Sequence, residues 1–224
     1  MGLRLLLFFI GYLIGCLQSA YATGRVVKGI DVREHGSGSA GMTNVVRVVG
    51  RLAGLFVFIF DVLKAIGAFL LGSLVIAHID FEFGIGLVQH SYSPLFPNMI
   101  MEGGIWAGLG VIIGHSFPIF LGFRGGKGIA SALGLMLVID WRAALVVYAI
   151  GTVVVLISRY ISLASLTMVF LFPIFLFFLG HATEVIVIVA VITALAFYLH
   201  RSNIQRLLAG NENKFSLSRK NKPF

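Results

Sequence analysis

Three short clusters of hydrogen-bond donors stand out against an otherwise apolar sequence. The first, HGSGSAGMTNVVRVVG at 35–50, combines glycine with serine, threonine, asparagine and arginine. The second, RGGKG at 124–128, places a lysine among glycines, and the third, HRSN at 200–203, follows an apolar segment. Glycines let backbone N–H groups converge, while hydroxyl, amide and guanidinium groups donate hydrogen bonds to anions. These residue types therefore predict binding sites for phosphate groups.

The first cluster could form a nest for an anionic oxygen from its glycine-rich backbone and its polar side chains. A flexible loop with a basic membrane anchor would need only glycine and serine. Here Thr43 and Asn44 are followed by Arg47 at helical spacing, which favours a binding site. We expect Ser37 and Arg47 to be catalytic. The expected substrate-binding residues are Gly36, Gly38, Gly41, Thr43 and Asn44.

The second cluster centres on Lys127, whose neighbours let the backbone approach a phosphate while the ammonium neutralises it. A loop that only fixes topology would not need glycines on both sides of the lysine. The cluster is not a Walker loop, because no serine or threonine follows the lysine and no strand is expected before it. We expect Lys127 to be catalytic. The expected binding residues are Gly125, Gly126 and Gly128.

The third cluster places His200 and Asn203 on one face of an expected helix, just beyond the last apolar segment. A lone interfacial histidine would more often only anchor the helix, but here an asparagine and arginines accompany it. We expect His200 and Asn203 to be catalytic. Ser162 and Ser165 are further candidates for substrate binding, although serines in membrane helices commonly serve helix packing.

The composition indicates a polytopic membrane protein. Of 224 residues, 58% are hydrophobic and 12% are charged, about half the usual ~25% of a soluble domain. The net charge of +8 does not indicate nucleic-acid binding, because the basic residues lie in short loops beside apolar spans.

Cys16 is the single cysteine, so there is no internal disulfide. Its Leu13–Cys16 context resembles a lipoprotein signal, but that interpretation would place five following basic residues outside the cell.

We expect an all-α fold with seven transmembrane helices in a single domain, 1–224. A helix needs about 20 apolar residues to cross a bilayer. The region after 128 is divided into four spans, because two longer ones would bury Asp140 and Arg142 near mid-membrane. The predicted spans are 3–23, 52–77, 104–121, 128–139, 141–157, 162–180 and 183–199.

Basic residues predict the orientation of these spans. With the N-terminus outside, fourteen of the 17 Lys and Arg residues lie in cytoplasmic loops or in the cytoplasmic tail 200–224. The predicted outer loop 78–103 has acidic residues but no lysine or arginine. All three donor clusters then face the cytoplasm, whereas His78, His90 and His181 fall outside.

The sequence gives little evidence for a metal site, a cofactor site or another kind of catalytic centre. Asp61 and Lys64, three apart within the second span, are interpreted as a structural ion pair, although ionisable residues at that depth are also functional candidates. There is no zinc-type motif, nucleophile elbow or dinucleotide fingerprint, so neither a metal nor a cofactor is expected. None of the six histidines is followed five residues later by aspartate, the dyad of the soluble-face glycerolipid acyltransferases.

The clusters resemble, in order, three motifs of the bacterial integral-membrane acyl-phosphate:glycerol-3-phosphate acyltransferases of phospholipid synthesis. The matching segments are GSGSAGMTNVVRVVG, GHSFPIFLGFRGGKGIASALG, and RYISLAS with HRSNIQRLLAGNEN. Asp61 and Lys64 fit a further DxxK element, and the resemblance covers nearly the whole chain. Ser39 stands where the family usually has asparagine, and the outer loop 78–103 looks long for the family.

The resemblance implies a seven-helix enzyme of the bacterial inner membrane. It would transfer a fatty acyl group from acyl phosphate to the sn-1 hydroxyl of glycerol 3-phosphate, giving lysophosphatidic acid and phosphate. The lipid bilayer and the enzyme that makes acyl phosphate are expected partners. We assign acyl phosphate to the Ser37–Asn44 nest with Arg47, and glycerol 3-phosphate to Lys127, His200 and Asn203, although the reverse division stays open. An acyl phosphate has a good leaving group, so His200 is expected to position substrate rather than act as a base.

Three other functions compete with this interpretation. A small-solute or phosphate transporter would need binding groups near mid-membrane and inverted repeats, which the sequence does not show. A non-catalytic assembly subunit would not need three phosphate-binding clusters. An acyltransferase that uses acyl-CoA or acyl carrier protein is the nearest alternative, and the absence of the His/Asp dyad counts against it.

Overall fold

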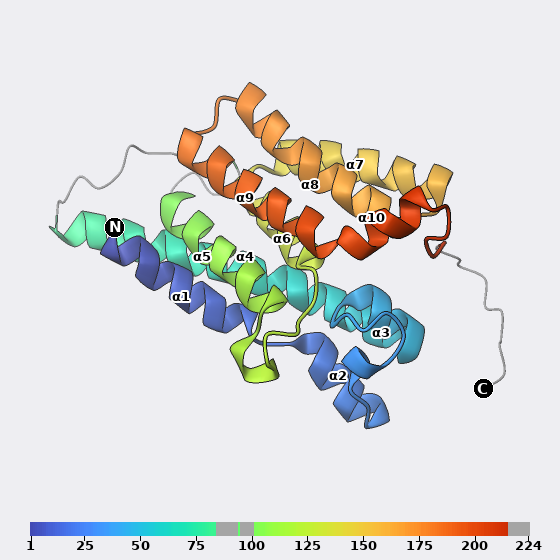
Figure 1. Ribbon diagram of the computed structural model, residues 1–224. Coiled ribbons are helices and arrows are strands. Elements are labelled where there is room, and N and C mark those ends of the chain that lie inside the picture. Colours follow the sequence, from blue (N-terminus) through green and yellow to red (C-terminus); the bar gives the residue numbers. More distant parts are fainter. Residues whose placement is uncertain (84–93, 95–100, 215–224) are drawn as a thin grey trace.

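The computed structural model describes residues 1–83, 94 and 101–214, and these residues form helices joined by short loops (Figure 1). No strand occurs among them. The α-helices are α1 (Gly2–Gly15), α2 (Ser19–Lys28), α3 (Met42–Val48), α4 (Arg51–Phe83), α5 (Met101–Ser116), α6 (Ile129–Ile139), α7 (Trp141–Ser158), α8 (Ile161–Phe178), α9 (Thr183–Leu199) and α10 (Arg201–Leu208). Two 3-10 helices, η1 (Val32–Glu34) and η2 (Ile119–Leu121), interrupt the loops.

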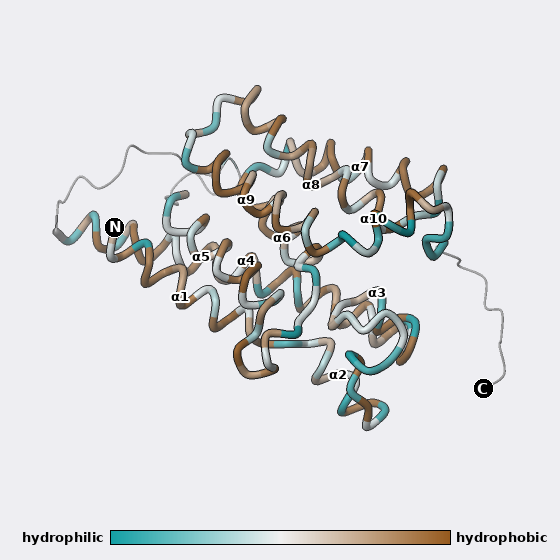
Figure 2. Tube along the Cα trace, in the orientation of Figure 1, coloured by the Kyte–Doolittle hydropathy of each residue, from teal (hydrophilic) through white to brown (hydrophobic). Residues whose placement is uncertain are grey.

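The protein is a multi-pass membrane protein by the length and apolar character of its helices. Five candidate spans are long and apolar enough to cross a bilayer: 2–28, 51–82, 101–121, 141–158 and 161–178. The helix α9 and the short α10 form a further candidate that is bent by 60°, while α6 is apolar but shorter. Hydrophobic residues run along these helices, and hydrophilic ones gather at the end that carries α10 and the segments around α2 and α3 (Figure 2).

Helix α5 packs closely against α1 through interlocking glycines. A Cβ added to Gly110 would lie 2.1 Å from the carbonyl oxygen of Phe8, and one added to Gly114 would lie 2.0 Å from that of Tyr12. From the other side, a Cβ on Gly11 would lie 2.0 Å from the carbonyl oxygen of Ala107. Small residues of this kind let membrane helices approach backbone to backbone. The end of α5, which leads into the second donor cluster, is thereby fixed.

Two boundaries differ from the predicted spans. The predicted span 3–23 lies within the candidate span 2–28, but its helix is interrupted between Gly15 and Ser19. There the Gln18 amide donates to the carbonyl oxygens of Gly15 at 3.3 Å and His115 at 3.0 Å. Helix α4 continues to Phe83 and α5 begins at Met101, so part of the predicted loop 78–103 is helical. Residues 84–93, which include His90, residues 95–100 and the tail beyond 214 lie outside the described residues.

The predicted break at Asp140 is confirmed. Its carboxylate caps α7 by accepting from the backbone N–H groups of Arg142 at 2.9 Å and Ala143 at 3.3 Å. It also pairs with the Arg142 guanidinium at 2.8 Å and with the His181 ring at 2.9 Å. This junction connects the start of α7 with the turn before α9, at the end of the bundle away from α2, α3 and α10 (Figure 1).

Candidate active site

In the first donor cluster, Asn44 shapes the loop around itself. Its side chain is 1% exposed and lies at the start of α3. The amide oxygen accepts from the backbone N–H of Ser37 at 2.8 Å, and the amide nitrogen donates to the carbonyl oxygens of Val32 at 2.8 Å and His35 at 3.0 Å. The Asn44 amide is therefore engaged within the protein, and it organises the nest rather than presenting a free donor.

The glycines of this loop allow its tight course. Gly36 and Gly38 have φ angles of 63° and 72°, and a Cβ on Gly36 would lie 2.3 Å from the Asn44 amide oxygen. Gly41 precedes α3 in an extended conformation, so a special backbone angle is not its role.

The side chains of Ser37, Thr43 and Arg47 are exposed. Among the described residues none holds an ion pair with Arg47, which leaves its guanidinium able to meet an anion.

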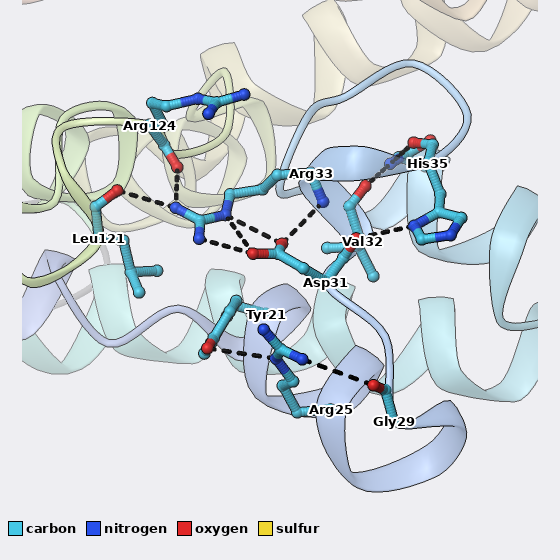
Figure 3. A network of polar contacts seen from close by, with 10 residues as sticks. Tyr21, Arg25, Gly29, Asp31, Val32, Arg33, His35, Leu121 and Arg124 are labelled. Carbon is cyan, nitrogen blue, oxygen red and sulfur yellow. Dashed lines mark hydrogen bonds and ion pairs between the residues drawn. The ribbon is translucent and has the colours of Figure 1, made fainter.

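Arg33 attaches the first cluster to the second (Figure 3). Its guanidinium pairs with Asp31 at 2.7 Å and donates to the carbonyl oxygens of Leu121 at 2.8 Å and Arg124 at 3.4 Å. The hydrogen bond from Arg33 lowers the pKa of Asp31 to about 2, so this pair is charged at neutral pH. A backbone bond from Ala40 N–H to the carbonyl oxygen of Gly125, at 3.3 Å, adds a second connection.

The glycines of the second cluster serve close packing. The N–H groups of Gly125 and Gly126 donate to the carbonyl oxygens of Ser116 at 3.2 Å and His115 at 3.1 Å. A Cβ on Gly126 would lie 2.2 Å from the Nε2 atom of His115. Gly128, with φ of 74°, caps the start of α6. The N–H groups of Gly125 and Gly126 are thus engaged within the protein, which leaves Lys127 and the start of α6 as the predicted phosphate-binding groups of this loop.

Lys127 joins the second cluster to the third. Its ammonium donates to the Asn203 amide oxygen, and the Asn203 amide nitrogen donates to Glu212 at 2.7 Å. Glu212 also accepts from the Ser162 hydroxyl at 3.1 Å and pairs with Arg206 at 2.7 Å. The structure therefore brings together three predicted site residues from distant parts of the sequence. Glu212, which sequence reasoning missed, is the group that connects them.

Burial sets the charge states in this cluster. Burial and the neighbouring Arg206 lower the pKa of Lys127 to about 8, so the ammonium is still largely protonated at pH 7. Burial and the Lys127 charge lower the pKa of His200, which lies just past α9, to about 4. Burial raises the pKa of Glu212, but hydrogen bonds from Asn203, Arg206 and Ser162 outweigh it and the pKa is lowered.

The neutral His200 ring has a defined tautomer. Its Nδ1 atom lies 2.8 Å from the carbonyl oxygen of Ala196, which can only accept, so Nδ1 carries the proton. The Nε2 atom is then an acceptor, suited to a hydroxyl group rather than to a phosphate oxygen. Ser165, by contrast, donates within its own helix to Ile161 at 2.9 Å and does not join the cluster.

The similarity to known proteins covers nearly all of the chain. A family model described as glycerol-3-phosphate acyltransferase matches residues 5–210. The chain belongs to this family. The glycerol-3-phosphate acyltransferases of Thermoanaerobacter sp. (strain X514) and Clostridioides difficile (strain 630) are both 37% identical to it over 205 residues, covering 92% of this chain and 92% of each relative.

Two solved structures share the fold of this acyltransferase family member. Both are crystal structures of PlsY (YgiH), described as an integral membrane glycerol 3-phosphate acyltransferase. The glycerol 3-phosphate form is 35% identical with a TM-score of 0.73, covering 95% of this chain and 96% of that one. The lysophosphatidic acid form is 34% identical with a TM-score of 0.74, covering 95% of each chain.

Within the described part of this acyltransferase family member, no three His, Cys, Asp or Glu side chains form a group that could hold a metal ion. The donor clusters contain the cationic side chains of Lys127 and Arg47, together with hydroxyl, amide and imidazole groups. Such a set suits phosphate esters, because cations and neutral donors share the charge of the phosphate oxygens.

Proposed function

We propose that the protein transfers a fatty acyl group from acyl phosphate to the sn-1 hydroxyl of glycerol 3-phosphate, the first acylation of phospholipid synthesis. The observation that carries this proposal is the junction of Lys127, Asn203 and Glu212, which presents a partly buried ammonium beside the neutral His200. Membership in the glycerol-3-phosphate acyltransferase family supports the acceptor.

In this proposal the two phosphates bind to different clusters. The phosphate of glycerol 3-phosphate meets Lys127, and Nε2 of His200 accepts a hydrogen bond from the acceptor hydroxyl. Acyl phosphate meets Arg47 and the Ser37 loop, with its acyl chain along the apolar helices. The sn-1 oxygen attacks the acyl carbon, and the bond from that carbon to the phosphate oxygen breaks. The hydroxyl proton passes to a phosphate, and lysophosphatidic acid and inorganic phosphate leave.

The proposal also places the site at the cytoplasmic face of a bacterial inner membrane, in one domain with seven spans and the N-terminus outside. The basic residues of the donor clusters and their common end of the bundle support this orientation. A thiol reagent that cannot cross the membrane should miss cysteines at the exposed Ser37 and Ser202 in intact cells, and should label one at Ala182. The opposite pattern would reverse the orientation.

A donor comparison tests the reaction itself. Purified protein in lipid vesicles is offered acyl phosphate, acyl-CoA and acyl carrier protein in parallel, each with glycerol 3-phosphate. Formation of lysophosphatidic acid from acyl phosphate is the expected result. Activity with a thioester but none with acyl phosphate would contradict the donor assignment while keeping the acceptor.

A further inference from the structure

A buried network of ionisable groups packs against the Gly125–Gly128 loop of the second cluster. On α4, the Lys64 ammonium is 2.7 Å from the Asp61 carboxylate, 3.2 Å from the carbonyl oxygen of Leu17 and 2.9 Å from Nδ1 of His115. The Ser19 hydroxyl donates to the same carboxylate at 3.0 Å. All four side chains are buried, in a part of the protein where an uncompensated charge would be costly.

The hydrogen-bond count fixes the protons in this network. An ammonium has three donors and no acceptor, and Lys64 has three acceptors around it. Nδ1 of His115 must therefore accept, which places the proton of the neutral ring on Nε2. Asp61 balances the charge of Lys64, so the pair is neutral as a unit. Lys64 thus sets both the tautomer and the orientation of His115.

The opposite edge of His115 faces the loop that carries Lys127. A Cβ added to Gly126 would lie 2.2 Å from the Nε2 atom of His115, so the ring is packed against the loop backbone. The carbonyl oxygen of His115 accepts from Gly126 N–H at 3.1 Å. It also accepts from the Gln18 amide at 3.0 Å, at the break between α1 and α2. The ring and the backbone of His115 therefore both help to hold this loop in place.

We propose that Asp61, Lys64 and His115 are positioning residues, which hold the Gly125–Gly128 loop so that Lys127 reaches the acceptor phosphate beside Asn203. This inference rests on the proposed function for its ligand. Lys64 fixes the His115 ring, the ring supports Gly126, and Lys127 is the next residue along the chain. None of the three touches substrate. Their loss should weaken binding of glycerol 3-phosphate without affecting the acyl donor held by the first cluster.

The test replaces the charged pair together. Asp61→Asn with Lys64→Met removes both charges, so no unpaired carboxylate remains, and His115 loses its partner at Nδ1. The KM for glycerol 3-phosphate should rise roughly 10-fold to 100-fold, the range expected when a binding group is misplaced by about 1 Å. The KM for acyl phosphate should stay within twofold.

A matched control comes from the other end of the bundle. Asp140→Asn with Arg142→Met also removes a paired buried carboxylate, but that junction follows the last residue of α6, whereas Lys127 precedes the start of the same helix. This control should leave both KM values unchanged. Equal rises in both substrates' KM, or a similar rise in the control, would indicate general loss of structure and overturn the inference.

Two measurements separate this inference from the proposed function. Nitrogen NMR of labelled histidine should show His115 protonated at Nε2 in the wild type, and a mixture of tautomers in the double variant. Calorimetric titration with glycerol 3-phosphate should show the same loss of affinity without any turnover. If wild-type protein binds glycerol 3-phosphate but does not use acyl phosphate, the donor assignment fails and the positioning network stands. If the double variant binds glycerol 3-phosphate as tightly as wild type, the network has no such role.

Discussion

Two lysines in this protein have opposite surroundings. Lys64 is enclosed within the bundle, and a carboxylate, a carbonyl oxygen and an imidazole occupy its three donors. Lys127 lies at the polar end and, within the described part of the chain, donates to the single amide oxygen of Asn203. An ammonium with all its donors satisfied stabilises structure, whereas one with donors left over can bind a ligand. Replacing lysine by methionine should therefore lower the stability of the protein at position 64 and its activity at position 127.

The largest effect should come from Lys64→Met. It leaves the Asp61 carboxylate buried without its counter-ion, which typically costs about 3–5 kcal/mol. We expect the free energy of unfolding in mixed micelles, measured by denaturant titration, to fall by that amount. Asp61→Asn with Lys64→Met should recover most of the loss. A single variant as stable as wild type would mean that the pair is not charged.

Lys127→Met should instead impair activity. Loss of a charge-assisted contact to phosphate costs about 1.5–3 kcal/mol, or about 10-fold to 100-fold in kcat/KM. The melting temperature should change little, because Asn203 keeps its hydrogen bond to Glu212. Steady-state kinetics and a thermal melt on one preparation provide both values. Full activity at matched expression would remove Lys127 from the site.

Arg47→Lys examines the other cation of the site. A guanidinium can meet a phosphate through two parallel N–H groups, and an ammonium cannot reproduce that fork. We expect kcat/KM for acyl phosphate to fall about 10-fold, and Arg47→Ala to fall further. Because Arg47 is exposed, neither change should alter the melting temperature. Wild-type kinetics in Arg47→Ala would exclude this residue from donor binding.

The pH dependence should follow Lys127 rather than His200. Lys127 is charged below its pKa of about 8 and loses its charge as pH rises through that value. The kcat/KM for glycerol 3-phosphate should therefore decline above about pH 8. His200, with a pKa of about 4, stays neutral over the same range and should produce no step near pH 6.5. A step near pH 6.5 in the wild-type pH profile that disappears in His200→Gln would indicate that His200 acts as a general base.

The smallest effect should come from His200→Gln. The carbonyl oxygen of glutamine can accept a hydrogen bond from the substrate hydroxyl, as proposed for Nε2 of His200. We expect kcat to fall by only about threefold, compared with about tenfold or more in His200→Ala. Comparing the two variants at saturating substrate checks this. Equal and complete loss in both, with normal glycerol 3-phosphate binding, would contradict a positioning role.

The helices were largely predictable, and their ends were less so. Apolar runs long enough to cross a bilayer located most of the spans, and the cost of burying Asp140 and Arg142 divided the region after 128. The break between α1 and α2 was missed because Gly15, Cys16 and Leu17 give no stop signal. Its cause is tertiary: the amide of Gln18 bonds across to His115. The break at Asp140 was predicted because burying Asp140 and Arg142 near mid-membrane would be costly, and in the structure Asp140 caps α7.

The candidate site was predictable where donors cluster along the chain. Arg47, Lys127, His200 and Asn203 were named from residue type and spacing, and the structure joins Lys127 to Asn203. Glu212 was missed because one acid in a polar segment resembles a solvated residue. The available signal was that it is the one acidic residue between 201 and 214, among several basic ones. His115 was missed because its ring partner Lys64 is 51 residues away in the sequence.

The contact of Glu212 with Asn203 and Ser162 has a consequence for biosynthesis. A ribosome makes the chain from its N-terminus, so every membrane helix is synthesised before this carboxylate emerges. Until then Asn203 lacks the partner that orients it toward Lys127. The nascent protein can thus insert and pack its helices while its site is still incomplete. The hydrogen bonds that Glu212 accepts from Asn203 and Ser162 can form only after all the described helices have been made.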